Sequence, residues 1–536
     1  MIKKIQNTMI LLVAIAMNKI YNDFKIVSHG LNGNKCYLDF KINETISNHD
    51  FTKIEKTIKK LIGSGLKFNI KKLNNKFIAN ANDIEILFND EIEDSSSKIK
   101  FFKLLQIGGL GNEKTRIHFC AFENKSEFEK YLEHLKEMNE IDHRKIGKEL
   151  GIFCFSDKVG QGLPIFLPNG AFIKDKISEY LKSICLKYDF ELVSSPILGS
   201  KELYITSGHW DLYKTNNFPP IKVDNEIYML RPMTCPHHMM IYKNEKKSYR
   251  DLPLALCEDS ILHRYESSGG LIGLERVRSM ELFDTHIFVT KNQVSEVIIK
   301  VYEMIKIVYK KLEIKIDKID LSLRSNEKEK FFNDDEMWKK AENELESTLN
   351  LMKVKYTKVL GEAAFYGPKI DFQYKTTNDK YITISTIQLD FLLPKKFELE
   401  YINVHGNFER PIIIHLGLIG TYERFISCLL SQTKGILPLW LTKKQVVIIP
   451  VNNNFHLEYA KKILEELKIN SIRASIDDSE ERMAKKIREA QISKIPFQII
   501  IGDEEVETQN FSYRKYGEKN TNKIFIKDFI KLFNYE

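Results

Sequence analysis

Residues 231–288 read RPMTCPHHMMIYKNEKKSYRDLPLALCEDSILHRYESSGGLIGLERVRSMELFDTHIF. Four histidines, two cysteines and five arginines are spread through this stretch, together with a Ser-Ser-Gly-Gly turn. Arg264 and Glu266 are two residues apart, so a strand over residues 262–266 would direct both side chains to one face. A guanidinium suits a phosphate and a carboxylate can accept from an amino group, so the pair indicates a nucleotide site.

The same stretch offers further ligands. Arg276 and Arg278 are fixed positive charges suited to phosphates, and Cys235 and His286 are soft metal ligands. His415 is a third soft ligand, and the gaps of about 50 and about 130 residues match no short structural zinc spacing. Three protein ligands with an open position are the catalytic pattern, but packed core residues are the more frequent explanation of such a trio.

Composition sets the broad class. The chain has 536 residues, which allows roughly three or four domains, and 43% hydrophobic with 29% charged residues is typical of a soluble globular protein. The net charge of +8 is compatible with a nucleic-acid partner but is weak evidence alone. Seven cysteines without a CxxC pair argue against a disulfide framework and favour a reducing, cytoplasmic location.

The N-terminus carries an apolar run, MILLVAIAM, at residues 9–17, after Lys3 and Lys4. This pattern is similar to the first two regions of a signal peptide. The run is shorter than the roughly 20 apolar residues of a membrane span. Because nothing downstream is typical of a secreted protein, we expect the first buried helix of a cytoplasmic domain and no membrane association.

Hydrophobic periodicity divides the chain into four parts. Residues 1–123 are predicted to be a small α/β unit, and residues 124–148 a linker helix that begins with a capping box at Ser126. Residues 149–441 hold the candidate chemistry. Residues 442–536 alternate strands and helices, which indicates a separate α/β domain with a largely parallel sheet.

Several motifs, taken together, resemble one family. They are RPMTCPHH, SYRDLPL, HRYESSGGLIGLERVR, THIF, GEAAFYGPKIDF, QLDF and HLGLIGTYERF. The chain after about residue 120 is similar, through these runs, to the threonyl-tRNA synthetases, which are class II aminoacyl-tRNA synthetases. The resemblance implies an α+β fold with an antiparallel catalytic sheet, a C-terminal α/β anticodon-binding domain, and a homodimer formed through class motif 1 around Pro196.

The resemblance also implies the reaction. Such an enzyme ligates L-threonine to tRNA(Thr) in two steps through a threonyl-adenylate, and uses Mg²⁺ with ATP and one Zn²⁺ per subunit. Arg264, Arg424 and His209 match catalytic residues, with His209 assigned to the transfer step. The matching ATP-site residues are Arg264, Glu266, Arg276, Lys369, Gln388 and Arg424.

The family's amino-acid and RNA sites map onto further residues. Cys235, His286 and His415 match zinc ligands, which replaces the core explanation of this trio. Zinc with an open position can take the hydroxyl of threonine, which valine lacks, whereas serine keeps the hydroxyl and loses only a methyl. The matching substrate residues are Asp284, Tyr366 and Thr386. The matching anticodon residues are Arg488, Glu505 and Arg514, for which plain surface charge is the alternative.

The sequence departs from the family pattern in two places. Met280 replaces the usual aromatic residue under adenine and Leu282 replaces a usual glutamine, while His237 stands at a usual glycine and is given no role. The N-terminal part is too short for the family's two N-terminal domains. Its first helix has Leu11 and Ile15 where an editing domain carries HxxxH. We therefore expect a shrunken editing domain that cannot clear Ser-tRNA(Thr).

Other functions remain possible at this point. A seryl enzyme would have a long coiled-coil arm, and a prolyl enzyme does not need the Cys-His-His trio. A non-catalytic tRNA-binding paralogue predicts losses among Arg264, Glu266 and Arg424, and all three are present. Leu282 is the one feature in favour of the paralogue.

Overall fold

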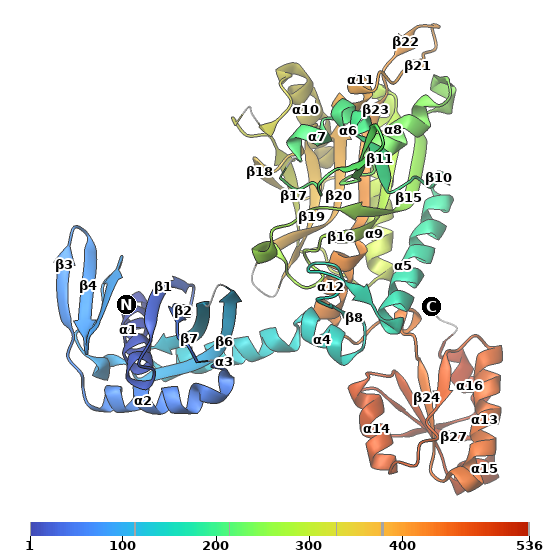
Figure 1. Cartoon of the computed structure of the whole chain (residues 1–536). Helices are drawn as coiled ribbons and strands as arrows, with labels where there is room; N and C mark the ends of the chain where they lie inside the picture. The colour runs from blue at the N-terminus through green and yellow to red at the C-terminus, as the bar shows by residue number, and fades with distance from the viewer. Residues whose placement is uncertain are drawn as a thin grey trace. The chain divides into compact units, whose positions relative to one another are not determined.

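The computed structural model describes residues 2–44, 46–111, 114–213, 215–327, 330–376 and 380–533. The chain divides into two compact units, Met1–Glu137 and Met138–Glu536. The first unit contains the blue elements at the start of the chain in Figure 1, and the second contains the green, yellow and red ones. Each unit has its own apolar core.

Helix α1 (Ile2–Ile20) forms the centre of the first unit. Every residue from Met9 to Met17 has an exposed fraction of 0%, because the helix is apolar on all sides and is covered on all sides. Helix α2 (Phe51–Gly63) packs against it through Ile54 and Ile58, which lie one turn apart. The predicted buried helix is thereby confirmed, and no described helix combines the length and apolarity of a membrane span.

Two antiparallel sheets surround α1, in the orders β1-β2-β7-β6 and β3-β4-β5. Their strands are β1 (Lys25–Asn32), β2 (Lys35–Lys41), β3 (Asn69–Leu73), β4 (Lys76–Ala81), β5 (Ile84–Phe88), β6 (Phe101–Gly111) and β7 (Lys114–Phe122). Helix α3 (Lys125–Glu140) follows. Its first-turn amide, Glu127 N, donates to the side-chain oxygen of Asn124 at 2.8 Å. The predicted cap at Ser126 is therefore wrong, because the helix begins one residue before it.

The second unit is built on an eight-stranded sheet with the order β10-β15-β16-β23-β20-β19-β17-β18 in its described part. The strands from β15 to β17 in this order are mutually antiparallel, which confirms the predicted class of sheet. They are β10 (Phe190–Leu192), β15 (Leu254–His263), β16 (Ser279–Val289), β17 (Lys318–Leu323), β18 (Thr357–Leu360), β19 (Lys369–Lys375), β20 (Tyr381–Asp390) and β23 (Ile412–Thr421).

Helices cover this sheet because they carry apolar stripes. Helix α9 (Val294–Lys311) buries Val294, Ile298, Val301 and Ile305, which recur at three or four residues and so share one side. The helices that pack into the same core are α4 (His143–Glu149), α5 (Pro168–Lys187), α10 (Asp335–Leu351) and α12 (Tyr422–Thr433). A smaller core contains residues of α8 (Cys235–Lys243) and α11 (Leu392–Lys396).

Short elements complete this part of the chain. Helices α6 (Lys201–Ser207) and α7 (His209–Leu212) are joined by Gly208, which has a φ of +87°. The remaining strands pair in small sheets: β8 (Phe153–Cys154) with β9 (Ile165–Phe166); β13 (Glu226–Leu230) with β11 (Leu198–Ser200) and β12 (Ile221–Val223); and β21 (Tyr401–Ile402) with β14 (Lys247–Ser248) and β22 (Phe408–Glu409).

The C-terminal part has its own sheet, β25-β24-β26-β27-β28. The first three strands are parallel and the last two antiparallel, so the predicted largely parallel sheet is only three strands wide. In Figure 1, α13 and α16 lie on one side of it and α14 on the other. The elements are β24 (Val446–Pro450), α13 (Asn453–Ile469), β25 (Ala474–Ile476), α14 (Met483–Ile492), β26 (Phe497–Ile501), α15 (Asp503–Thr508), β27 (Phe511–Lys515), β28 (Asn522–Ile524) and α16 (Ile526–Lys531).

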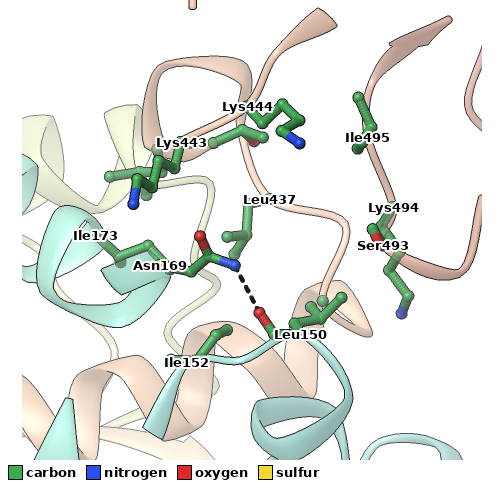
Figure 2. A pocket seen from close by; sticks show the side chains of 13 residues that line it. Leu150, Ile152, Asn169, Ile173, Leu437, Lys443, Lys444, Ser493, Lys494 and Ile495 are labelled. Carbon is green, nitrogen blue, oxygen red and sulfur yellow. Dashed lines mark hydrogen bonds between the residues drawn. The ribbon is translucent and has the colours of Figure 1, made fainter. Parts of the chain in front are cut away.

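A cavity of about 200 Å³ lies within the second unit, between the start of α5, the segment after α12 and the loop before β26. Asn169 donates its side-chain amide to the carbonyl oxygen of Leu150 at 2.8 Å on its wall (Figure 2). Figure 2 shows the ammonium groups of Lys443, Lys444 and Lys494 pointing to different sides of this cavity. They do not converge on one point, so the cavity offers no focused anion site.

Candidate active site and metal centre

Two rows of paired residues cross the large sheet and carry the candidate chemistry. His286 on β16 is paired with His415 on β23, and His415 is paired with Gln388 on β20. Two residues away, Asp284 is paired with Gly417 on the same strands. Directly paired residues project to the same side of a sheet, and so do residues two apart. The register therefore brings residues more than 100 positions apart onto one face.

The potential metal ligands meet on this face. Cys235, at the start of α8, joins His286 and His415, and one ligand atom of each lies within 4.8 Å of the others. All three are buried. This is the one group of three such side chains close enough to share a metal within the described residues.

The ring nitrogens of the two histidines are held by outer partners. His286 shares a 2.8 Å hydrogen bond with His238 between their Nδ1 atoms, and His415 Nε2 is bonded to Asp390 at 2.8 Å. Asp390 also accepts from the backbone amides of Leu392 and Leu393, so its position is fixed. Such partners leave the second nitrogen of each ring available and are typical of metal-binding histidines.

The electrostatics of the trio also fit a divalent cation. Burial lowers the pKa of His286 well below its usual value, so the ring is neutral, which is the form that binds metal. Burial, with the nearby carboxylates of Asp284 and Asp390, raises the pKa of Cys235. A thiolate at this position therefore requires a cation beside it. The donor set, one sulfur and two imidazoles, is one that zinc favours.

A cavity of about 380 Å³ opens beside the trio. Its lining includes His286, His415 and Asp284 together with Arg264 and Arg424. It is large enough for a small ligand, and its lining carries three cations, Arg264, Lys369 and Arg424. Nine of the predicted site residues line it: Arg264, Asp284, His286, Tyr366, Lys369, Thr386, Gln388, His415 and Arg424.

Part of the cavity wall is a hydrogen-bonded network. Tyr366 stacks on the ring of His415, with centroids 4.8 Å apart, and donates its hydroxyl to Gln388 Oε1 at 2.6 Å. Thr386 donates to Asp371 at 2.9 Å, and Lys369 Nζ lies 3.0 Å from the same carboxylate. These contacts hold the predicted substrate and ATP residues in place before any ligand enters.

The two arginines reach the cavity in different ways. Arg264 lies one residue beyond the end of β15, so the predicted strand over 262–266 is wrong; its guanidinium is held by Pro232 O at 3.2 Å and Met233 Sδ at 2.8 Å. Arg424 lies in the first turn of α12, where Thr421 caps its amide, and its Nε donates to Glu275 O at 3.2 Å. Burial lowers the pKa of Arg424, but a guanidinium remains charged.

Four of the predicted catalytic-domain residues lie outside the lining of this cavity: Cys235, Glu266, Arg276 and His209. Glu266 is paired with Arg276 at 3.0 Å, so each partly neutralises the other. His209 is fully buried behind the trio, with Nε2 3.9 Å from Cys235 Sγ and Nδ1 2.8 Å from Ser207 Oγ. Burial lowers the pKa of His209 to about 3, so the ring is neutral.

The predicted anticodon residues lie on three different elements of the C-terminal part, α14, α15 and β27. Arg488 is exposed on α14. Both oxygens of Glu505 are used inside the protein, since they accept from Gly502 N at 2.9 Å and Ser512 Oγ at 2.8 Å. Arg514, on β27, is paired with Gln498, and its Nε has no hydrogen-bond partner among the described residues.

Several residues that support the site were not predicted from the sequence. His238 and Asp390 orient the metal-type histidines, and Asp371 joins Lys369 to Thr386. Asp390 belongs to the QLDF run and Asp371 to the GPKID run. Each motif thus contains a carboxylate that the sequence shows. Its hydrogen-bond partner depends on the strand register, which the sequence does not show. His238 gave a weaker signal because His237 beside it is of the same type.

The predicted editing positions of the N-terminal unit carry aliphatic side chains in place of polar ones. Leu11 and Ile15 have exposed fractions of 0% and belong to the aliphatic core around α1. Within the described part of this unit, no trio of metal-type ligands occurs.

Comparisons with known proteins agree with this architecture. Residues 213–433 match the tRNA synthetase class II core domain (G, H, P, S and T), and residues 445–535 match the anticodon binding domain. The chain is 44% identical to threonine–tRNA ligase of Ureaplasma parvum serovar 3, over 99% of this chain and 98% of that protein. It is 42% identical to threonine–tRNA ligase 1 of Bacillus subtilis (strain 168), over 97% and 86%.

A solved structure is also similar. The RNA binding domain of threonyl-tRNA synthetase from Cryptosporidium parvum Iowa II has a TM-score of 0.69 and 33% identity, and the match covers 73% of this chain and 98% of that one.

Proposed function

The chain belongs to the threonine–tRNA ligase family of class II aminoacyl-tRNA synthetases, and from this premise we propose that it selects threonine with a zinc ion held by Cys235, His286 and His415. The observation that carries the proposal is a single cavity whose lining includes His286 and His415 of this trio together with Arg264 and Arg424. An amino acid at the trio and a nucleotide at the arginines would therefore share one cavity.

Threonine selection follows from the donor set and its neighbours. A zinc ion bound here would supply an open coordination position for the amino and hydroxyl groups of threonine. Asp284, which is buried in the lining of the same cavity, can accept from the substrate hydroxyl, which valine lacks. Serine keeps that hydroxyl, and the lost methyl is worth roughly 1–3 kcal/mol. The site should therefore reject valine well and serine poorly.

Activation of threonine takes place at the two arginines. The carboxylate attacks the α-phosphate of ATP, which is bound with Mg²⁺, and pyrophosphate leaves. Arg264 and Arg424 stabilise the charge that develops on the phosphate oxygens. Lys369 lies on the same wall, held by Asp371. Leu282 also lines the cavity, so one wall that carries a glutamine in the family pattern is apolar here.

The second step moves threonine to the terminal adenosine of tRNA(Thr). His209 is the proposed residue of this transfer step because it matches the family pattern; it is buried outside the cavity lining, with Nε2 3.9 Å from Cys235 Sγ. Arg488, Glu505 and Arg514 are the proposed anticodon contacts. Glu505 must release Gly502 N or Ser512 Oγ to read a base, whereas Arg488 is already exposed.

The remaining expectations form part of the same proposal. Residues 1–123 are a shrunken editing-like domain, 124–148 a linker, 149–441 the catalytic domain and 442–536 the anticodon-binding domain. Leu192, Ile197 and Leu198 are exposed around Pro196, which supports a homodimer through this segment. All seven cysteines are free, which supports a reducing, cytoplasmic location.

Loss of editing rests on α1. Hydrolysis of Ser-tRNA(Thr) by paired histidines needs side chains that reach the substrate, and Leu11 and Ile15 are aliphatic and have exposed fractions of 0%. We expect the purified protein to release no serine from Ser-tRNA(Thr) above the spontaneous rate. Measurable enzyme-dependent deacylation would contradict this part of the proposal.

Threonine-dependent ATP–pyrophosphate exchange tests the central proposal. Exchange should be strong with threonine, weaker with serine and absent with valine, and it should disappear after zinc is removed by a chelator and return when zinc is restored. Exchange that survives complete zinc removal would overturn the role of the trio. No exchange with threonine in the presence of zinc would favour a non-catalytic tRNA-binding paralogue, with Leu282 as the first suspect.

A further inference from the structure

Helix α4 begins with a buried histidine, His143, that the proposed reaction does not use. It follows Asp142, which caps the helix by accepting from Arg144 N at 2.8 Å. The exposed fraction of His143 is 3%, and its ring stacks on Phe153 with centroids 6.3 Å apart. A polar ring at this depth requires partners, because an unpaired buried polar group costs free energy.

The partners of His143 lie in the loop between β15 and β16. Its Nε2 accepts from the backbone amide of Leu274 at 3.1 Å. Its Nδ1 is 3.5 Å from a carboxylate oxygen of Glu275, on the same loop. Since Nε2 accepts, the proton of the neutral ring is on Nδ1 and points to Glu275. Burial lowers the pKa of His143 to about 4, so this tautomer persists at neutral pH.

Gly273 shows how closely the ring and the loop approach each other. A Cβ at this position would lie 2.3 Å from His143 Nε2, and the φ of Gly273 is +45°. Only glycine allows both the backbone conformation and the contact. The loop is therefore shaped around the histidine at this point.

The other side of the same short segment holds ATP-site residues. The carbonyl oxygen of Glu275 accepts from Arg424 Nε at 3.2 Å, and the next residue, Arg276, pairs with Glu266 at 3.0 Å. His143 and Arg424 thus contact the same residue of the loop, Glu275, one through its carboxylate and the other through its carbonyl. Helix α4 also packs against α12, the helix that carries Arg424.

From this geometry we propose that His143 is a positioning residue for the ATP site: it fixes residues 273–276, so that the carbonyl of Glu275 orients Arg424 and Arg276 stays beside Glu266. The inference rests on the proposed role of these residues in binding ATP. It makes α4, none of whose residues line the substrate cavity, a determinant of ATP affinity.

Two amide variants separate position from polarity. H143Q places an amide oxygen near the location of Nε2, where it can accept from Leu274 N, whereas H143N carries the same group one methylene short of it. With ATP varied at saturating threonine and wild type as reference, H143N should raise the KM for ATP about tenfold, while H143Q should stay within about threefold. The KM for threonine should be unchanged in both.

His456 provides the matched control. It is also buried, and its Nδ1 accepts a backbone amide, that of Asn452, at 3.0 Å, but it lies in the C-terminal part. H456Q should leave the KM for ATP unchanged. Hydrogen exchange of the peptide that covers residues 267–278 gives a readout without turnover: it should be faster in H143N than in H143Q.

The outcomes distinguish this inference from the proposed function. A wild-type enzyme without exchange activity would overturn the proposed function, and the hydrogen-exchange comparison would still test whether His143 holds the loop. An active wild type with the same KM for ATP in H143N and H143Q would overturn the positioning role. Equal rises in the KM for ATP and the KM for threonine, with a fall in kcat, would also overturn the positioning role, because they indicate general loss of structure.

Discussion

The interiors of the two units differ in what they bury. Around α1 the buried side chains at the editing positions, Leu11 and Ile15, are aliphatic, whereas the catalytic sheet buries His286, His415 and Asp284 on one face. Aliphatic burial stabilises a fold, but burial of polar groups costs free energy unless partners or ligands satisfy them. A polar interior therefore indicates a site, and the aliphatic side chains at positions 11 and 15 support the proposed loss of editing.

The largest expected effect comes from returning a histidine to the aliphatic interior. L11H replaces a fully buried leucine in a core that offers no designed acceptor, so the first unit should lose about 3–5 kcal/mol of stability. Hydrogen exchange of the peptides covering α1 in the full-length protein measures this loss. The exchange should be accelerated there and unchanged in β16 and β23.

K19H is the matched control, because Lys19 is on the same helix but exposed. It should leave the protection of α1 as in wild type. Normal protection of α1 in L11H would mean that this interior tolerates a polar ring, and the contrast between the two units would lose its basis.

Buried carboxyl groups also differ between the two units, since the pKa of Asp39 is lowered and the pKa of Glu423 is raised. In the first unit, burial alone would raise the pKa of Asp39, but hydrogen bonds from Arg116 at 2.6 Å and from Ser28 outweigh it and lower the pKa. In the second unit, burial raises the pKa of Glu423 to about 7; its hydrogen-bond donor is the amide of Glu281 at 3.1 Å, with Lys174 as the nearby cation.

The raised pKa of Glu423 predicts a stability that falls with pH. The folded protein keeps this proton up to about pH 7, whereas the unfolded chain releases it near pH 4.5. The stabilisation is thus complete below pH 4.5 and is lost as pH rises through 7. Wild type should lose roughly 2–3 kcal/mol relative to E423Q between pH 5 and pH 8, as measured by urea unfolding at both values.

The lowered pKa of Asp39 has the opposite effect on the pH dependence of stability. The contribution of Asp39 is present above its unfolded value near 3.8 and is lost only as pH falls below it, so it is constant between pH 5 and pH 8. D39N should therefore show the same difference from wild type at both values. A pH dependence of the wild-type protein that persists unchanged in E423Q would show that Glu423 is not its source.

Among the proposed metal ligands, Cys235 offers a direct test of the polar interior. C235A removes the one sulfur of the trio, so zinc should be lost and kcat/KM for threonine-dependent exchange should fall about 100-fold or more, equivalent to about 2.7 kcal/mol. C257A is matched, since Cys257, on β15, is also fully buried but lies outside the trio. Equal zinc content in the two variants would remove Cys235 from the site.

The sequence predicted most of this interior because class-defining motifs contain the reacting side chains themselves. Nine residues expected from these motifs line the cavity. The burial of α1 was also predictable, because an unbroken apolar run of nine residues is unfavourable in contact with water. What these cases share is that local sequence alone determines the outcome.

Contacts across the chain were beyond such reasoning. Arg264 lies after the end of β15 because the strand's pairing with β16 stops at His263 and Ser279. Glu505 is engaged by Ser512 Oγ, which no spacing rule predicts. His143 stands about 130 residues before the loop it contacts. Register and long-range packing decide these positions, and neither is encoded in a local pattern.

The smallest expected effect comes from the adjacent pair His237 and His238, which a sequence alone cannot tell apart. His238 shares a hydrogen bond with His286 at 2.8 Å and lies 3.8 Å from Glu258, whereas His237 Nε2 faces the backbone oxygen of Leu198 at 3.4 Å. H238L should weaken zinc binding about tenfold, or about 1.4 kcal/mol, because the ring of His286 loses its orienting partner. Equilibrium dialysis against buffered zinc measures the change, and H237L should leave it within about twofold. If H238L and H237L both bound zinc like wild type, packing alone would orient His286. The buried His238 would then have only a structural role, as the aliphatic side chains around α1 have.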